Sequence, residues 1–165
     1  MRREPDDPVD YLQQTRDSYA ELGYPEYRWA HHPEPIPLVP PSKPLNESTV
    51  ALIASGGIYR HGQVAFTHKD DVTWREIPSD TPTDELRVTH FAFDQTNARN
   101  DPNVVLPLAA LRTLVAEGEL GGLSDHALTF MGGIYSQRRV REELIPGLVD
   151  QIRGMAPDLV LLVPV

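Results

Sequence analysis

The chain has 165 residues, of which 40% are hydrophobic and 24% charged, and its formal net charge is −9 at pH 7. This length fits one domain with its own core, the acidic balance argues against nucleic acid as the main partner, and no apolar run approaches the roughly 20 residues of a membrane span. Because the chain contains no cysteine, disulfides, thiolate metal sites and thiol catalysis are excluded for residues 1–165.

The N-terminal segment predicts a helix over residues 8–22. Asp6 or Asp7 is a suitable N-cap, Pro8 suits the first turn, and apolar side chains recur at helical spacing. Gly23 then ends the helix. The opening MRREPDD has arginines but no apolar stretch after them, so no signal peptide is visible and we expect a cytoplasmic protein.

Residues 25–44 are dense in proline and read PEYRWAHHPEPIPLVPPSKP. Proline excludes helix and disfavours a central strand, so we expect an extended arm. Its apolar side chains, Trp29 and Ile36 among them, predict that the arm lies along the domain surface or along a partner in a homo- or hetero-oligomer. The expected organisation is an N-terminal helix and arm over residues 1–44 and an α/β domain over residues 45–165.

From residue 48 onward, strands and helices alternate. Strands are predicted at 48–55, 85–93, 127–133 and 157–165, the first and last as buried strands, with an edge strand at 71–77. Helices are predicted at 106–121 and at 136–155, the second kinked or divided by Pro146 and Gly147. The pattern predicts a three-layer α/β fold with about four parallel strands plus an edge strand or hairpin, and helices on both faces.

The word GGIY occurs twice, at 56–59 and at 132–135, each time at the end of a predicted strand. In open α/β sheets, ligands bind beyond the carboxyl ends of the strands, so both words are expected at one functional edge. Glycine pairs there let the backbone approach a ligand or form an anion-binding nest, or they only end a strand. The candidate substrate-binding residues at this edge are Ser55, Gly56, Gly57, Tyr59, Asp94, Arg99, Asp101, Asn103, Gly132, Gly133, Tyr135 and Arg138.

His61 and His90 are candidate catalytic residues for proton transfer. His61 follows a strand in a polar loop and is the better general-base candidate, whereas a histidine inside a strand, as at His90, is more often a satisfied core group. In the polar loop 94–103, Arg99 stands between Asp94 and Asp101, either as part of a site or in a self-satisfied turn. No histidine pair has metal-site spacing, so no metal is expected, and no flavin or nicotinamide fingerprint is visible.

Long stretches of the domain are similar to a known family. They are KPLNESTVALIASGGIYRHGQVAF at 43–66, IPSDTPTDELRVTHFAFDQTNARNDPNVVLPLAALRTLVAEGELGGL at 77–123, and FMGGIY at 130–135. These stretches resemble the selenoprotein B family of glycine, sarcosine and betaine reductases and the related D-proline reductase subunit. The resemblance covers most of residues 43–165 and rests on many points rather than on one short motif.

The resemblance implies a subunit of a reductase that cleaves an α C–N bond. Such proteins use a selenocysteine or cysteine nucleophile, work with a subunit that carries a pyruvoyl group, and receive electrons from thioredoxin-type proteins. The nucleophile is expected just after the strand that reads DLVLLVPV, and therefore just beyond Val165. No cofactor is evident in the chain itself, so a thioredoxin-like or thiol donor is expected to supply the electrons.

These observations leave several functions open. The first is a reductase subunit that binds a small polar substrate, with His61 or His90 handling protons. The second is a non-catalytic binding or assembly subunit that has lost the redox group. The third is cofactor-free acid–base chemistry by His61 with the loop from Asp94 to Asp101.

Overall fold

The computed structural model describes residues 10–26, 30–37 and 39–165, and divides the chain into two compact units, residues 1–38 and 39–165. In the first unit, α1 (Tyr11–Glu21) confirms the predicted helix. Asp10 caps it by accepting a hydrogen bond of 3.0 Å from the Gln13 amide, and Gly23 follows its end with φ +72°. The predicted caps at residues 6 and 7 lie outside the described residues.

The proline-dense segment has no regular secondary structure where the structure describes it. Residues 30–37 and 39–44 form neither helix nor strand, and Trp29 lies outside the described residues. The role of the arm in contacting a partner, and the predicted boundary after residue 44, therefore stay predictions. Across residues 10–26, 30–37 and 39–165, no helix combines the length and the apolar character needed to cross a membrane.

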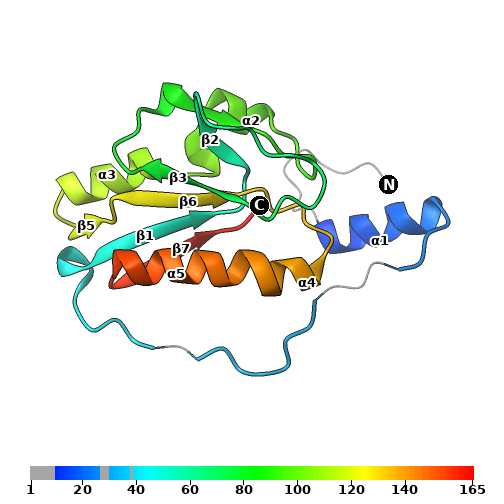
Figure 1. The fold of residues 1–165 in the computed structure, drawn as a ribbon, viewed down its shortest axis with the longest axis horizontal. Helices are drawn as coiled ribbons and strands as arrows, with labels where there is room; N and C mark the ends of the chain where they lie inside the picture. The colour runs from blue at the N-terminus through cyan, green and yellow to red at the C-terminus, as the bar shows by residue number, and fades with distance from the viewer. Residues whose placement is uncertain (1–9, 27–29, 38) are drawn as a thin grey trace. The chain divides into compact units, whose positions relative to one another are not determined.

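In the second unit, β1 (Thr49–Ala54) is the centre of a five-stranded sheet (Figure 1). β7 (Leu159–Val163) lies parallel along one side of β1. β5 (Gly122–Leu123) and β6 (His126–Phe130) follow one another, also parallel to β1, along its other side. β3 (Trp74–Pro78) pairs antiparallel with β6 at the sheet edge. The strands predicted at 48–55, 71–77, 127–133 and 157–165 are thus confirmed.

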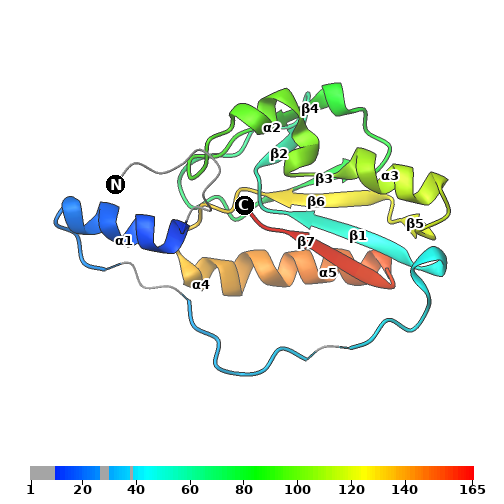
Figure 2. The ribbon, with the colours of Figure 1, turned by 180° about the vertical axis from the view of Figure 1, so that it is seen from behind.

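Helices cover both faces of this sheet, as Figures 1 and 2 show from opposite sides. α3 (Leu108–Ala116) packs into the core cluster that contains Leu52 of β1. α5 (Ile145–Met155) packs into a second cluster that contains Ile53, the next residue of β1. Because successive strand residues point to opposite faces, these two clusters are the two faces of one sheet, and the predicted three-layer arrangement is confirmed.

The predicted helix at 136–155 changes type along its length rather than breaking. α4 (Gln137–Arg139) leads into a π-helical segment, η4 (Val140–Leu144), and α5 continues from there with Pro146 in its first turn. Gly147 lies against Trp74 of β3, where a Cβ atom would come within 2.5 Å of the indole ring. The glycine therefore lets α5 lie close to the sheet.

The predicted strand at 85–93 is wrong in both extent and partner. Only β4 (Leu86–Val88) is a strand, and it pairs antiparallel with β2 (Ile58–Arg60) in a separate two-stranded sheet. Gly57, with φ +69°, lies between β1 and β2, where the chain leaves the main sheet for the small one. Residues 89–95 form a loop, followed by α2 (Thr96–Asn100), and short 3₁₀ turns lie at η1 (Leu45–Glu47), η2 (Thr83–Glu85) and η3 (Pro102–Val104).

β7 was predicted as a buried strand, and this is also wrong. It pairs with β1 alone among the described strands, which makes it the edge strand opposite β3. Val160, Leu161 and Leu162 are exposed, Leu162 by 65%. An apolar sequence is typical of a strand buried in a parallel sheet, but burial depends on neighbouring elements that the sequence of the strand does not specify.

Candidate functional site at the carboxyl edge of the sheet

The carboxyl ends of β1, β6 and β7 meet at one edge, and hydrogen bonds join the segments that follow them. The Gly132 amide donates to the Ser55 carbonyl oxygen at 2.8 Å, and the Val165 amide donates to Ser55 Oγ at 2.9 Å. Gly56 and Met131 form an isolated β-bridge. The expectation that both GGIY words lie at the same edge is confirmed.

Glycine in both words lets the 89–93 loop lie directly against this edge. A Cβ atom at Gly57 would lie 2.1 Å from the Thr89 carbonyl oxygen, and one at Gly133 would lie 2.5 Å from the Phe91 ring. Real Cβ atoms do not come this close, so another residue at Gly57 would require the loop backbone to move, and one at Gly133 would require the Phe91 ring to move. The glycines therefore determine how the loop is placed, beyond ending two strands.

His90 lies in that loop and is almost fully buried, with 2% of its surface exposed. Its Nδ1 accepts a hydrogen bond of 3.0 Å from the Ala92 amide, so the neutral ring carries its proton on Nε2. Burial, and secondarily the electrostatic effect of the neighbouring His68, lowers the pKa of His90. Among the described residues, Nε2 finds no hydrogen-bond partner, as is also true of buried side-chain atoms of Arg60, Thr81 and Ser124. A buried donor without a partner costs about 1–3 kcal/mol, which a bound water or ligand group would offset.

Two phenylalanine rings contact His90, Phe93 at 4.7 Å and Phe91 at 6.0 Å between ring centroids. Phe91 stacks on Tyr135 of the second GGIY word, with ring centroids 6.0 Å apart and an interplanar angle of 20°. His68 lies 5.8 Å from the same Phe91 ring, and His90 lies 6.0 Å from it. We call His68, Phe91 and Tyr135 the aromatic shelf. Neither His68 nor Phe91 was predicted as a site residue, because no local pattern marks a ring that reaches its neighbours only through the fold.

His61 and Arg138 do not join this edge group. His61 is exposed in the turn that follows β2, and its amide donates to Glu85 at the opposite end of the small sheet from His90. The structure thus separates the two predicted catalytic histidines. Arg138 is exposed and forms an ion pair of 2.6 Å with Glu142, one helical turn further on.

The polar loop 94–103 is satisfied by its own turns. The Asp94 carboxylate accepts from the amide and hydroxyl of Thr96, and Asp101 accepts from the amide and side chain of Asn103. These hydrogen bonds lower the pKa of both carboxyl groups. Arg99 pairs with neither carboxylate and instead donates to Gln95 at 3.2 Å. The turn interpretation therefore holds for both aspartates.

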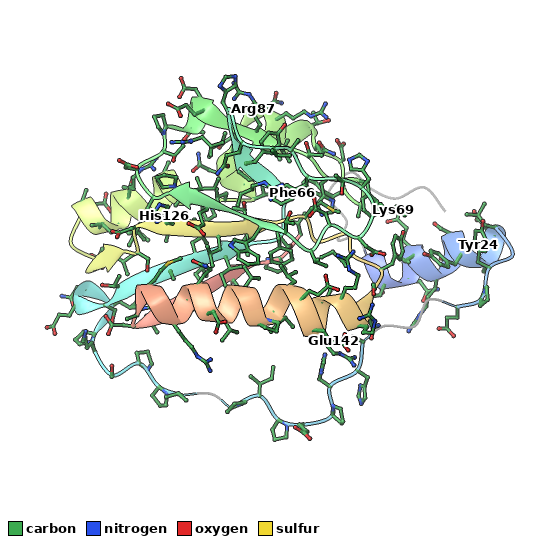
Figure 3. All side chains as sticks on the ribbon, in the orientation of Figure 1. Tyr24, Phe66, Lys69, Arg87, His126 and Glu142 are labelled. Atoms are coloured by element: carbon green, nitrogen blue, oxygen red, sulfur yellow. The ribbon has the colours of Figure 1, made fainter. Side chains whose placement is uncertain are left out.

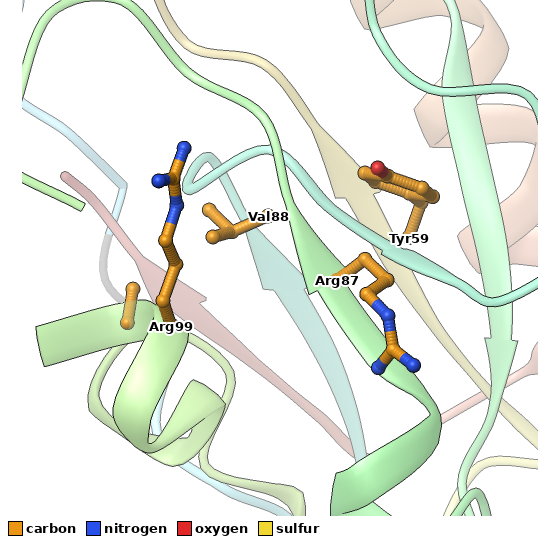
Figure 4. Close-up of a pocket in the computed structure, with 5 residues that line it drawn as sticks. Tyr59, Arg87, Val88 and Arg99 are labelled. Carbon is orange, nitrogen blue, oxygen red and sulfur yellow. The ribbon is translucent and has the colours of Figure 1, made fainter. Parts of the chain in front are cut away.

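Arg99 and Tyr59 are found together in a shallow hollow of about 430 Å³, lined also by Arg87, Val88 and Ala98 (Figure 4). Arg87 stands opposite Tyr59 in the β2–β4 ladder, at the outer side of the small sheet (Figure 3). The guanidinium groups of Arg87 and Arg99 point away from one another. None of Ser55, His90 or the second GGIY word lines this hollow, so it is separate from the carboxyl edge.

A candidate metal centre is not found in the part of the chain that the structure describes. No three side chains of histidine, aspartate or glutamate converge there in a way that could hold an ion.

Comparison with known proteins gives consistent matches over most of the chain. The glycine/sarcosine/betaine reductase selenoprotein B family matches residues 25–151. D-proline reductase subunit gamma of Acetoanaerobium sticklandii is 31% identical over 133 residues, which are 77% of this chain and 55% of the relative. Glycine reductase complex component B subunit gamma of Carboxydothermus hydrogenoformans is 30% identical over 102 residues, or 59% of this chain and 23% of the relative.

Betaine reductase complex component B subunit beta of Peptoclostridium acidaminophilum is 28% identical over 102 residues, again 59% of this chain and 23% of the relative. The chain thus spans about half the length of the first of these relatives and about a quarter of the other two. No solved structure matches.

Proposed function

The chain belongs to the glycine/sarcosine/betaine reductase selenoprotein B family, and we propose that it serves in a reductase complex as the subunit that holds a small polar substrate at the carboxyl edge of its sheet. One observation carries the proposal: the segments after β1, β4 and β6 converge there around His90, whose buried Nε2 finds no hydrogen-bond partner within residues 10–26, 30–37 and 39–165. Relatives are named as subunits of such complexes, and this supports a hetero-oligomeric assembly.

The proposed reaction is reductive cleavage of a C–N bond next to a carboxylate. The C–N bond breaks, a C–H bond forms, and two electrons and two protons are taken up as the amine leaves. His90 is suited to donate a hydrogen bond from the unpartnered Nε2 of its neutral ring to the negative charge that develops on the substrate carboxylate as the electrons enter. The two protons come from the solvent. A small amino acid or N-methylated amino acid is the proposed substrate.

The redox group and the electrons are proposed to come from outside residues 1–165, which contain no cysteine. A thiol or selenol just beyond Val165 would enter beside Ser55, because the Val165 amide already donates to Ser55 Oγ. It would then stand at the edge that holds His90. A thioredoxin-like or thiol donor is the proposed source of the two electrons.

Reconstitution tests this function. The chain, extended through any coding sequence that follows Val165, is combined with the reductase components of its host and dithiothreitol. Cleavage is measured as amine release from glycine, sarcosine and betaine, and as ring opening to 5-aminopentanoate from D-proline. His90→Gln is expected to lower kcat about 100-fold with little change in KM. His126→Gln, at the amino end of β6 (Figure 3), is the matched control and should leave both constants unchanged. Turnover of none of the four substrates by an intact complex, or an unchanged kcat for His90→Gln, would refute the proposal.

A second candidate is a binding or assembly subunit without redox chemistry, since residues 1–165 contain no cysteine. It predicts a complex whose turnover does not respond to His90→Gln. Intact mass spectrometry of the native protein separates the two candidates, because a heavier protein with a further cysteine or selenocysteine would exclude the second.

A further inference from the structure

β7 is an edge strand that lacks the features by which proteins normally protect a sheet edge. Its residues, Leu159–Val163, are all apolar, with no charged side chain and no proline among them. It pairs with β1 alone among the described strands, at the edge opposite β3, so its other side is open (Figure 2). Native edges usually carry charged side chains, proline, a bulge or a covering loop, because an open apolar edge pairs with other strands.

β3, at the opposite edge of the same sheet, has this protection. Its sequence, WREIP, contains two charged residues and a proline. The loop that precedes β3 also binds it: Gln63 Nε2 donates to the Glu76 carbonyl oxygen at 3.0 Å, and Arg75 Nε donates to the Val64 carbonyl oxygen at 2.8 Å. The sheet therefore ends at β3 in the manner of a native edge, whereas β7 has the composition of a strand that is paired on both sides.

The exposed apolar side chains of β7 continue onto α5. Val160 and Leu162 are exposed, and they lie on the face of the sheet that α5 covers, because Leu162 is level with Ile53 of β1. On α5, Ile145 and Val149 are exposed as well. We call Ile145, Val149, Val160 and Leu162 the β7 patch.

The helix residues of the patch lie on the side of α5 that is turned away from β3. Ile145 and Val149 each stand two positions from Gly147, which lies against Trp74 of β3. Residues two positions apart in an α-helix point in nearly opposite directions, about 200° apart. The two side chains therefore face the β7 edge, and the patch is one apolar surface of the kind that marks a protein interface.

The distribution of charge favours a second copy of the chain as what covers this surface. The whole chain has a formal net charge of −9, which opposes self-association. Residues 136–165, which contain α5 and β7, have four arginines and four acidic residues and thus no net charge. Two copies can therefore meet at this segment without the repulsion that the acidic remainder of the chain would bring.

We propose that β7 pairs antiparallel with β7 of a second copy, so that two five-stranded sheets join across a two-fold axis. When the pairing is centred on Leu161, every residue of Leu159–Val163 stands opposite another apolar residue. A two-fold axis requires such self-complementarity, because one surface meets itself. Antiparallel pairing leaves the two carboxyl edges at opposite ends of the joined sheet, where both stay open. The pairing goes beyond the proposed function and does not depend on it.

Analytical ultracentrifugation of the purified chain, from roughly 1 μM to 1 mM, tests the assembly. We expect a concentration-dependent species with twice the 18.5 kDa mass of the chain. Leu162→Lys should raise the dimer Kd at least about 100-fold, because its charge is desolvated twice at a two-fold interface. Glu76→Lys, at an exposed position of β3, is the matched control and should leave the dimer in place. Both variants make the chain less acidic, so a loss in Leu162→Lys alone reports its position.

A disulfide crosslink tests the strand register without weakening the interface. Because residues 1–165 contain no cysteine, Leu161→Cys introduces a single thiol. Cβ atoms directly opposite one another in an antiparallel pair are about 4.5–5.5 Å apart, which allows a disulfide to form with oxidised glutathione as the oxidant. We expect a covalent dimer from Leu161→Cys and none from Glu76→Cys.

Three results would each overturn the proposal. The first is a monomer throughout the concentration series, which would indicate that a different partner, such as another subunit of the complex, covers β7. The second is a dimer that Leu162→Lys weakens no more than Glu76→Lys does. The third is a dimer in which Leu161→Cys forms no crosslink, because the two copies would then meet through another surface or in another register.

Discussion

Replacing Gly57 by alanine is the sharpest test of how the carboxyl edge is assembled. Gly57 has φ +69°, and a Cβ atom there would lie 2.1 Å from the Thr89 carbonyl oxygen. The neighbour is backbone and cannot turn aside as a flexible side chain would. The loop that carries His90 therefore has to move away from the sheet.

The size of the effect follows from the contacts that are lost. The left-handed conformation costs alanine about 1–2 kcal/mol. Movement of the loop breaks the bond of 2.9 Å from the Thr89 amide to the Gly57 carbonyl oxygen. This bond contributes about 0.5–1.5 kcal/mol. The expected loss is about 1.5–3.5 kcal/mol, a large fraction of the free energy of unfolding of a small domain.

Urea denaturation followed by circular dichroism measures this loss. Gly118→Ala is the control, because Gly118 has a similar φ of +76° but nothing within 4 Å of the position of a Cβ atom. It should lose only the conformational part, about 1–2 kcal/mol. Equal losses for the two variants would show that the Thr89 loop does not lie against Gly57, and would refute the proposed assembly of the edge.

Further predictions concern α5, the shelf and pH. Gly147→Ala should lower the urea midpoint although alanine favours helix by about 1 kcal/mol, because its Cβ atom would lie 2.5 Å from the Trp74 ring; a higher midpoint would contradict this contact. Asp70→Ala should cost about 1–3 kcal/mol in thermal denaturation by removing the acceptor of the Tyr135 amide, whereas Asp70→Asn keeps an oxygen and should cost less; equal losses would count against that role. Burial, and then a neighbouring histidine, lowers the pKa of His90 below its ordinary value of 6.5. Below about pH 6.5 the unfolded chain thus binds this proton more readily than the folded chain, so stability falls as the pH drops. His90→Gln should flatten that fall, and an unchanged slope of unfolding free energy against pH would exclude His90 as its source.

The periodic elements of the fold could be predicted because their patterns allow few alternatives. Apolar runs ending in Gly-Gly mark β1 and β6, and the alternation with helices implies a parallel sheet. The alternating apolar side chains at 85–93 predict a strand but do not indicate its partner. Only residues 86–88 form a strand, and they pair with β2 in a separate small sheet. The prediction that β7 is buried was wrong for a related reason, because an apolar strand is buried only where other elements cover it.

The site was predictable only where backbone geometry decides it. The ends of parallel strands share one edge, so the meeting of the two Gly-Gly pairs followed from the strand assignments. Asp70 gave no signal, because it binds a loop 65 residues away through a backbone amide that any sequence would offer. The polar loop around His61 favours it over His90 as a general base. An exposed loop position does not, however, place a side chain at the carboxyl edge of the sheet. His90 was expected to be a satisfied core group because it was placed inside a predicted strand. It is buried in a loop instead, and its Nε2 finds no partner among the described residues.

The two GGIY words both need glycine next to the 89–93 loop, but their tyrosines lie in different places. In both copies a glycine stands where a side chain would strike the 89–93 loop, from the Thr89 side at Gly57 and from the Phe91 side at Gly133. The tyrosines then separate: Tyr59 continues into β2 of the small sheet, whereas Tyr135 stacks on Phe91. Gly57 thus places the loop backbone that carries His90, and Gly133 places the Phe91 ring beside Tyr135. A change at Gly57 should therefore displace His90, whereas a change at Gly133 should disturb the stack of Phe91 on Tyr135.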